Sequence, residues 1–334
     1  MIAKMKRRKF ITLIGGAAVM SSLLSPLAAR AQQRMPVIGY LYSGGAETSA
    51  PWLAAFRKGL NQVGFFEGRN VEIEYRWANN EPERLPGLAA DLVRRRVAVM
   101  VSPGIAEAAL AAKAATATIP IVFRSGGDPV ALGLVASLNR PGGNITGINA
   151  MSQETGSKRL GLLHELLPRA ERFTVLANTN DPNAGRSIKE LQAAAAGLGK
   201  QIEVVSASSN HEIDLAFAGF AQKRPEALLV DCQGLLNNRR VQIVTQATRH
   251  VLPAIYCVRD FVEIGGLMSY GASATDQFRL TGVYAGRVLK GEKPADMPVL
   301  RASKFDLVIN LQTAKVLGID IATTLLARTD EVIE

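Results

Sequence analysis

The residues that could bind a ligand most directly follow a short apolar run at 121–123, which favours a buried β-strand. Arg124, Ser125 and Asp128 come next, together with two glycines that allow a sharp turn. Asp128 occupies an N-cap position and Pro129 the first position of a helix, with apolar residues at helical spacing after them. This order predicts a strand, a polar turn and a helix N-terminus, whose backbone N–H groups can bind an anion or a small polar ligand. A capped turn without a ligand is the alternative interpretation.

Residues for catalysis or metal binding do not form a recognisable pattern. His164, His211 and His250 lie far apart within helix-like segments. No Ser-His-Asp order and no GxSxG motif occur, and no GxGxxG follows the first expected strand. The two cysteines have neither CxxC nor metal-ligand spacing. The sequence therefore predicts that the protein is not an enzyme and that it holds no cofactor and no metal.

Cys232 and Cys257 each end an apolar run that predicts a strand. In an oxidising compartment the two could form a disulfide if those strands are neighbours. We expect two separate thiols instead, because adjacent parallel strands seldom present disulfide geometry. The sequence does not decide whether Cys232 and Cys257 form a disulfide.

The first 31 residues predict an export signal. Residues 6–11 are basic, an apolar stretch continues to Leu27, and the small-residue pattern at 29–31 fits a cleavage site after Ala31. Arg7 and Arg8 fit a twin-arginine signal, although Sec signals also carry adjacent arginines. A membrane anchor is disfavoured because the apolar run is short and contains serines. We expect a mature periplasmic chain that begins near Gln32.

The charge of the mature chain argues against nucleic acid as a partner. The chain has 334 residues, of which 48% are hydrophobic and 20% charged, as in proteins with sizeable cores. The signal holds six basic residues and no acid, so the formal net charge falls by six, from +10 to +4, on cleavage. Such a charge on a long chain does not indicate a nucleic-acid binder. The arginine run at 94–96 is typical of a solvated helix face.

Apolar β-type runs alternate with amphipathic helical patterns along the mature chain, in two successive series. This predicts an α/β fold of two doubly wound, mostly parallel lobes. We expect residues 32–148 plus about 272–297 in the N-terminal lobe, and 149–271 plus about 298–334 in the C-terminal lobe. Ligands of open α/β sheets bind outside the carboxyl ends of the strands, so the polar loops there should face one cleft.

Seven segments in this order carry the motifs of one known family: VEIEYRW at 71–77, IPIVFRSGGDP at 119–129, LVASL at 134–138 with PGGNITG at 141–147, GGLMSYG at 265–271, LKGEKPADMP at 289–298, KFDLVINLQTAKVLG at 304–318 and DEVIE at 330–334. They resemble the ABC-transporter substrate-binding proteins of periplasmic binding protein type I fold, in particular the group that takes up aromatic amino acids. The resemblance implies a receptor with a multi-strand hinge that closes on a small molecule and delivers it to the membrane permease of an importer. We expect the protein to be a monomer or a weak dimer.

The same resemblance places ligand-binding residues in the strand-end loops of both lobes. Ser102 and Ser125 would hold a carboxylate with nearby backbone N–H groups, and Asp231 would pair with a ligand cation. Arg124 makes the loop after the fourth expected strand more basic than in the aromatic amino-acid binders. Arg124 and Arg259 together argue against an amino-acid ligand and make a carboxylate-rich ligand possible. The serines could instead cap turns, and the tyrosines could be core residues. The expected ligand-binding set is Tyr42, Ser43, Gly44, Ser102, Pro103, Gly104, Arg124, Ser125, Asp128, Asn178, Asp231, Gln233, Tyr256, Arg259 and Tyr270.

The function expected from these observations is a solute-binding receptor of an ABC importer, with an amino acid, an aromatic acid or another carboxylate as ligand. An orphan receptor that signals to a membrane sensor kinase is the first alternative, and gene neighbourhood would discriminate the two. An exported oxidoreductase is the less favoured alternative.

Overall fold

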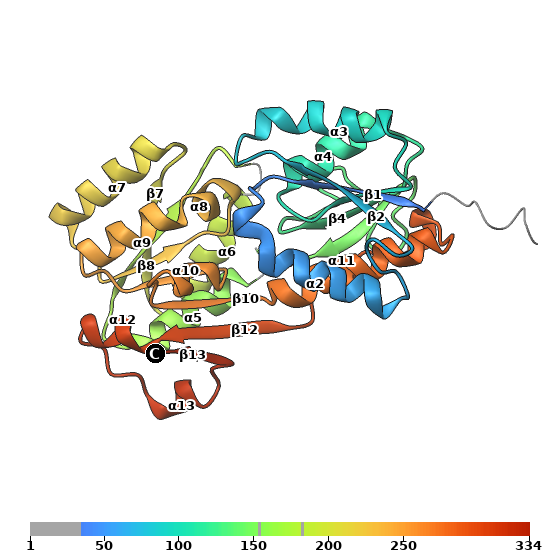
Figure 1. Ribbon diagram of the computed structural model, residues 1–334. Helices are drawn as coiled ribbons and strands as arrows, with labels where there is room; N and C mark the ends of the chain where they lie inside the picture. Colours follow the sequence, from blue (N-terminus) through green and yellow to red (C-terminus); the bar gives the residue numbers. More distant parts are fainter. Residues whose placement is uncertain (1–34, 153–154, 182–183) are drawn as a thin grey trace, which may run out of the picture. The chain divides into compact units, whose positions relative to one another are not determined.

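The computed structural model describes residues 35–152, 155–181 and 184–334 (Figure 1). The expected export signal at 1–31 and its cleavage site lie outside the described residues. From Val37 to the C-terminus the chain builds two β-sheets, each with helices on both faces. Among the described residues, no helix combines the length and the apolar character that crossing a membrane requires.

The first sheet has six parallel strands in the order β11-β5-β4-β3-β1-β2. Side chains alternate along them, so one face packs against α2 and α11 and the other against α3 and α4. Short 3-10 turns η1 (Glu47–Ser49), η2 (Pro82–Arg84) and η3 (Pro294–Asp296) lie between these elements. The bounds are β1 Val37–Tyr42, α2 Ala50–Gln62, β2 Glu72–Trp77, α3 Leu85–Arg94, β3 Val99–Ser102, α4 Ala106–Ala115, β4 Ile121–Ser125, β5 Ile145–Asn149, α11 Ala274–Leu289 and β11 Leu300–Arg301.

The second sheet has seven strands in the order β13-β12-β10-β9-β8-β6-β7. All neighbouring pairs are parallel except β10 with β12. The expected fold class, two mostly parallel doubly wound lobes, is therefore confirmed. The bounds are α5 Gly156–Leu166, β6 Arg172–Ala177, α6 Ala184–Gly197, β7 Gln201–Ser206, α7 Asn210–Lys223, β8 Ala227–Val230, α8 Gly234–Asn238, α9 Arg240–Arg249, β9 Ala254–Tyr256, α10 Asp260–Glu263, β10 Met268–Ala272, β12 Phe305–Asn310, α12 Leu311–Val316, α13 Thr323–Leu326 and β13 Glu331–Ile333.

The chain passes between the two sheets three times: after β5, between β10 and α11, and between β11 and β12. Leu300 and Arg301 pair with Ile148 and Asn149 of the first sheet. The last crossing therefore falls after residue 301, slightly later than the boundary expected near 298.

Helix α11 returns to the first lobe because it packs closely along α2 (Figure 1). A Cβ atom at Gly59 would lie 1.8 Å from the carbonyl oxygen of Arg279, and one at Gly282 would lie 2.1 Å from that of Phe56. Only glycine fits at these two positions, so the helix backbones touch. This packing brings the first turn of α11 to the carboxyl end of the first sheet.

The helix expected after Asp128 does not form, and that prediction was wrong. Asp128 Oδ1 accepts a hydrogen bond from the backbone N–H of Val130 at 2.9 Å, so it does cap the chain locally. The N–H groups of Leu134 and Val135 both donate to the carbonyl of Pro129, however, because Gly133 adopts a left-handed conformation with φ of 68°. The segment is a series of turns. No helix terminus is therefore available at this loop.

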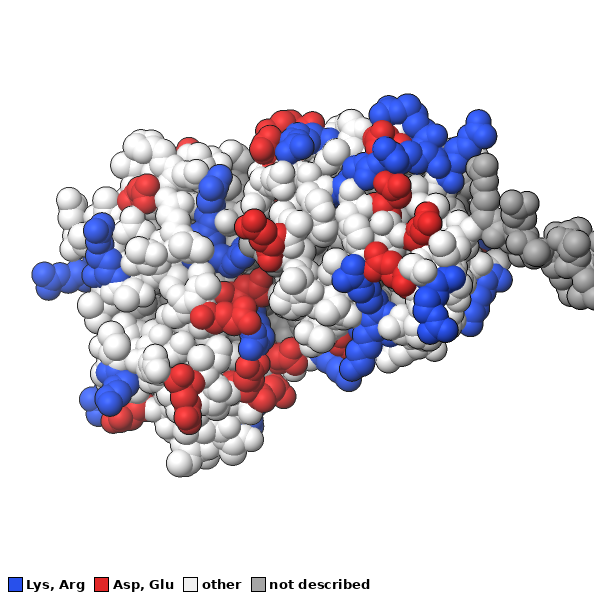
Figure 2. All heavy atoms as spheres, in the orientation of Figure 1, with Lys and Arg blue, Asp and Glu red and all other residues white. Residues whose placement is uncertain are grey.

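The arginine run at the end of α3 is a solvated helix face, as expected. Arg94 and Arg95 are exposed and pair with Asp91 at 3.0 and 3.1 Å. Hydrogen bonds from Arg76, and also from these two arginines, lower the pKa of Asp91 to about 2. Figure 2 shows acidic and basic side chains mixed over one face of the molecule.

Candidate functional site

Strand-end loops of both sheets line one cavity of about 240 Å³. The first lobe contributes the loops after β3 and β4, because the carboxyl ends of parallel strands meet at one edge of a sheet. The second lobe contributes the loops after β6, β8 and β9. The lining includes Gly104, Ile105, Arg124, Gly126, Gly127, Ser152, Asp181, Cys232, Gln233, Gly234, Asn237 and Val258.

Arg124 is the cation of this cavity wall. It is half-buried on β4, its Nε donates a hydrogen bond to Oε1 of Gln277, and its guanidinium lies 5.6 Å from the ring centroid of Phe278. Burial lowers the pKa of Arg124. Within the described ranges no carboxylate forms an ion pair with it. A guanidinium in this state can bind an anionic group of a ligand in a bidentate manner.

Aromatic side chains gather beside Arg124, and we call Tyr42, Trp52, Trp77 and Phe278 the aromatic wall. The rings of Trp52 and Phe278 stack at 5.5 Å, and Tyr42 contacts Trp77 at 5.9 Å and Phe278 at 6.3 Å. Tyr42 and Trp52 are half-buried. None of the four side chains lines the cavity of about 240 Å³, and Phe278 is buried. The half-buried rings of Tyr42, Trp52 and Trp77 are the ones that a flat apolar group can contact. The sequence interpretation found Tyr42 but missed Trp52, Gln277 and Phe278, which lie in the first turns of α2 and α11.

The loop after β3 presents unpaired donors on the other face of the sheet. Ser102 is fully buried, and its hydroxyl has no hydrogen-bond partner among the described residues. After Pro103, Ile105 is the N-cap of α4 and cannot cap it with a side chain, so the first N–H groups of α4 are uncapped. A Cβ atom on Gly104 would lie 2.9 Å from Ser43 Oγ, which indicates that the loops after β1 and β3 touch.

Three further predicted residues of the first lobe mainly hold loop structure. The carbonyls of Ser43 and Gly44 accept hydrogen bonds from Asn80 and Asn79. Ser125 is buried, and its hydroxyl donates to the carbonyl of Gly127 at 3.3 Å.

Asp128, which caps the turn described above, also reaches the second lobe. Its Oδ2 atom lies 3.6 Å from Nη1 of Arg186 in α6. Asp128 therefore links the lobes and does not line the cavity.

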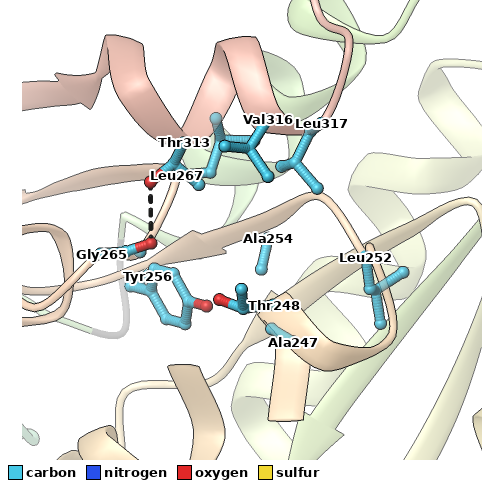
Figure 3. A pocket seen from close by; sticks show the side chains of 11 residues that line it. Ala247, Thr248, Leu252, Ala254, Tyr256, Gly265, Leu267, Thr313, Val316 and Leu317 are labelled. Carbon is cyan, nitrogen blue, oxygen red and sulfur yellow. Dashed lines mark hydrogen bonds between the residues drawn. The ribbon is translucent and has the colours of Figure 1, made fainter. Parts of the chain in front are cut away.

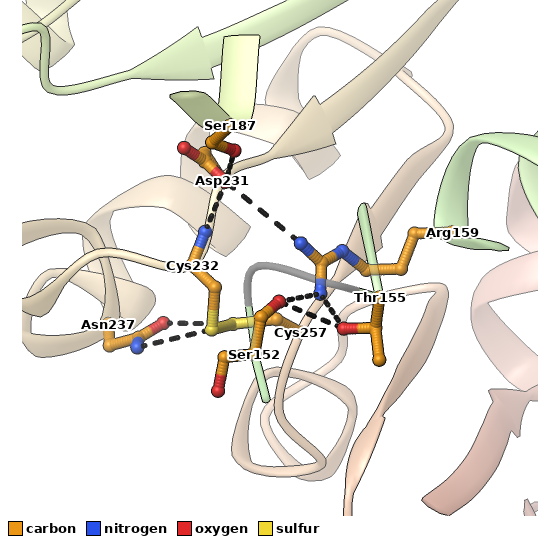
Figure 4. Close-up of a disulfide and its surroundings, with 8 residues drawn as sticks. All are labelled: Ser152, Thr155, Arg159, Ser187, Asp231, Cys232, Asn237 and Cys257. Atoms are coloured by element: carbon orange, nitrogen blue, oxygen red, sulfur yellow. Dashed lines mark hydrogen bonds and ion pairs between the residues drawn. A yellow bond between two sulfur atoms is a disulfide. The ribbon is translucent and has the colours of Figure 1, made fainter. Parts of the chain in front are cut away.

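In the second lobe, Gln233 lines the cavity and joins two loops. Its Oε1 accepts from the backbone N–H of Asn178 at 2.5 Å, and its Nε2 donates to the carbonyl of Asn178 at 3.1 Å. Asp231 points into the lobe instead. Its Oδ1 accepts from Ser187 Oγ at 2.9 Å and lies 3.9 Å from Nη2 of the buried Arg159 (Figure 4). Burial raises the pKa of Asp231, and the charge of Arg159 opposes that rise.

The remaining predicted residues lie away from the cavity lining. Tyr256 is buried and lines a small separate pocket with Thr248 and Thr313 (Figure 3). Tyr270 stacks on Phe305 at 6.0 Å. Arg259 is paired with Glu263 and, at 2.5 Å, with Glu331. Arg259 is thus paired with two glutamates of its own lobe. Of the two arginines expected to bind a carboxylate-rich ligand, only Arg124 has no carboxylate partner in the described residues.

Asp260, at the start of α10, is an acidic residue that the sequence interpretation missed. Burial raises the pKa of its carboxyl group, and Arg240, Arg124 and Arg259 oppose that rise. No cation lies within ion-pair distance of it in the described part of the chain. Asp260 therefore places a partly buried carboxylate of the second lobe within electrostatic range of Arg124.

Cys232 and Cys257 form a disulfide with a Cα–Cα distance of 5.6 Å, so the expectation of separate thiols was wrong (Figure 4). Their strands, β8 and β9, are neighbours in the sheet, with Leu229 opposite Ile255. Both cysteines lie just beyond the strand ends, where the chain is no longer held in the pleat. The geometric objection from paired parallel strands does not apply there.

Comparison with known proteins gives consistent results. Residues 51–333 match the family model described as ABC transporter substrate binding protein. A tyrosine-binding protein of Clostridioides difficile is 27% identical over 264 residues, which cover 78% of this chain and 75% of that protein.

Two solved structures share the fold closely. One is a conserved domain protein of Vibrio cholerae, with a TM-score of 0.80, 27% identity, and coverage of 90% of this chain and 100% of that one. The other is an ABC domain of Streptococcus pneumoniae in complex with L-Trp, with a TM-score of 0.80, 26% identity, and coverage of 89% and 99%.

Proposed function

This chain belongs to the family of ABC transporter substrate-binding proteins, and on that premise we propose that it is the extracytoplasmic receptor of an importer for aromatic carboxylates, with aromatic amino acids as the first candidates. The export signal expected at 1–31 and the cognate membrane permease are part of this proposal.

The observation that carries the ligand class is the position of Arg124 beside the aromatic wall. Arg124 offers a charged donor without a carboxylate partner in the described residues, and the ring of Phe278 lies 5.6 Å from its guanidinium. A ligand that contacts both the Arg124 guanidinium and the aromatic wall needs an acid group and a flat ring close together. The buried hydroxyl of Ser102 and the uncapped N-terminus of α4 add further donors for an anionic group.

Asp260 favours an amino acid among such ligands. An amino acid brings an ammonium group as well as a carboxylate, and Asp260 would supply the opposite charge from the second lobe. Two relatives agree with this choice, because one is described as a tyrosine-binding protein and another was solved with L-Trp. Arg259 does not count against an amino-acid ligand, because its guanidinium is already paired with Glu331.

Transport would use closure of the two lobes on the ligand. A ligand held by Arg124 of the first lobe and Asp260 of the second has contacts in the closed state that it lacks in an open one. Only such differential contacts can shift the equilibrium towards closure. The three chain crossings would act as the hinge, and the closed form would be the one that the permease recognises.

The test is calorimetric titration of the protein without residues 1–31, using L-tryptophan, L-tyrosine and indole-3-propionate. We expect Arg124→Gln to weaken binding roughly 10- to 100-fold, the value of a charge-assisted hydrogen bond. Arg140→Gln is the matched control, because Arg140 is exposed and does not line the cavity. Equal affinities of the two variants would remove Arg124 from the site, and no binding of any probe would refute the proposed ligand class.

A further inference from the structure

The disulfide between Cys232 and Cys257 lies in the wall of the ligand cavity. Cys232 lines the cavity itself, and so does Val258, the residue after Cys257. The bond therefore joins the loop after β8 to the loop after β9 on the side where a ligand would be held. The chain contains no other cysteine, so a reductant has a single disulfide to act on.

The bonded loops carry the contacts that shape the second lobe's part of the site. Gln233, next to Cys232, attaches the loop after β8 to the loop after β6 through its two hydrogen bonds to Asn178. Asn237 lies beside the bond, with its amide 3.9 Å from the sulfur of Cys232 and 3.6 Å from that of Cys257 (Figure 4). Gln233 and Asn237 both line the cavity, so the residues nearest the bond in the loop after β8 are part of the cavity wall.

Besides the hydrogen bonds of Gln233, buried side chains of the next two helices hold the loops, namely Leu236 in α8 and Phe261 and Val262 in α10. The helices that follow them, α8 and α10, have five and four residues and no side-chain hydrogen bond at their N-caps. Helices this short are not stable by themselves. Strands β8 and β9, in contrast, are fully buried inside the sheet. Loss of the bond should therefore loosen the cavity wall while the sheet persists.

We propose that the Cys232–Cys257 bond is a positioning element of the ligand site and that its redox state sets ligand affinity. The inference rests on the proposed function, because it concerns the same cavity. A dithiol would transfer two electrons and two protons to the bond, leaving two protein thiols and its own disulfide. In the reduced protein a ligand must order the freed loops as it binds, which lowers its affinity.

Ligand binding and reduction of the bond affect each other reciprocally. If the bond strengthens ligand binding by some factor, bound ligand must make the bond harder to reduce by the same factor. Ligand would also cover Cys232, which lines the cavity, and so slow the attack of a thiolate.

The experiment measures the dissociation constant of L-tryptophan by calorimetry for the oxidised protein, the dithiothreitol-reduced protein and the Cys232→Ser/Cys257→Ser variant. We expect reduction and the double substitution each to weaken binding about tenfold, within the usual range of coupling between sites. Dithiothreitol should not change the affinity of the double variant, which has no cysteine left. The midpoint of reduction by dithiothreitol, measured with and without saturating L-tryptophan, should shift by the same factor and needs no variant to fold.

Each outcome decides a different claim. Equal affinities in the oxidised and reduced protein, with an unshifted reduction midpoint, would overturn the positioning role but leave the receptor function standing. Absence of binding to the oxidised protein would refute the receptor function for this ligand and the inference with it. Far-ultraviolet circular dichroism of the reduced, ligand-free protein should stay that of the native fold, and a collapse of the signal would contradict the local role.

Discussion

Replacing Arg159 by methionine tests the buried ion pair beneath the cavity wall. Arg159 is fully buried in α5, and its Nη1 donates to the carbonyl of Ser152 at 3.1 Å and to Thr155 Oγ1 at 2.9 Å. Its Nη2 lies 3.9 Å from Oδ1 of Asp231. The arginine thus ties the first chain crossing to the loop after β8. Methionine keeps much of the volume but removes the charge and both hydrogen bonds.

The size of the effect follows from the distance and the burial. Two unit charges 3.9 Å apart attract by about 4 kcal/mol at an effective dielectric constant of roughly 20. Burial works against the charged state of both groups: it lowers the pKa of Arg159 to about 10 and raises that of Asp231. Arg159→Met leaves the buried carboxylate of Asp231 without its cation, so we expect a loss of about 3–5 kcal/mol in unfolding free energy at pH 7. Arg159→Met/Asp231→Asn should recover most of that loss.

Urea denaturation followed by circular dichroism at pH 7 and pH 5 provides the assay. A buried carboxyl group with a raised native pKa binds a proton more readily in the native than in the unfolded state. Between its ordinary value of 3.8 and the raised value, stability therefore increases as the pH falls. Without Arg159 the native pKa of Asp231 rises further, so the deficit of the single variant should shrink at pH 5. A loss below about 1 kcal/mol, or no rescue by Asp231→Asn, would refute this reasoning.

Two other substitutions have expected outcomes. Gly282→Ala should lower the free energy of unfolding by about 3 kcal/mol, because its Cβ would lie 2.1 Å from the carbonyl oxygen of Phe56 and force α2 and α11 apart. Thermal unfolding measures this loss of stability. Gly161→Ala is the control in α5, where a Cβ meets nothing within 4 Å, and should change stability by less than about 1 kcal/mol. Asp260→Asn should weaken L-tryptophan roughly tenfold and leave indole-3-propionate unchanged in calorimetric titration. Equal losses for both ligands would show that Asp260 does not bind the ammonium group.

The general fold could be predicted from the sequence because its signals are local. Apolar runs such as 37–42 and 172–177 are buried strands of parallel sheets, and their period and length identify them without tertiary information. The carboxyl-end rule then indicates the loops that line the cavity, among them those that contain Gly104, Arg124 and Gln233.

The errors concern features that tertiary structure decides. Pairing of Cys232 with Cys257 depends on the order of strands in the sheet, which local patterns do not give. Phe278 reaches the first lobe only because α11 packs back along α2. Arg259 pairs with Glu331, which is 72 residues away in the sequence. Local sequence patterns therefore cannot predict this ion pair. The missing helix after Asp128 is the exception, because Gly133 was a visible local signal.

The most direct test of the central claim is a crystal structure of the protein without residues 1–31, grown with L-tryptophan. We expect the ligand between the two lobes, with its carboxylate within hydrogen-bond distance of the Arg124 guanidinium and its ring against the aromatic wall. Density for the ligand on an outer face, or in contact with one lobe only and remote from Arg124, would contradict the account.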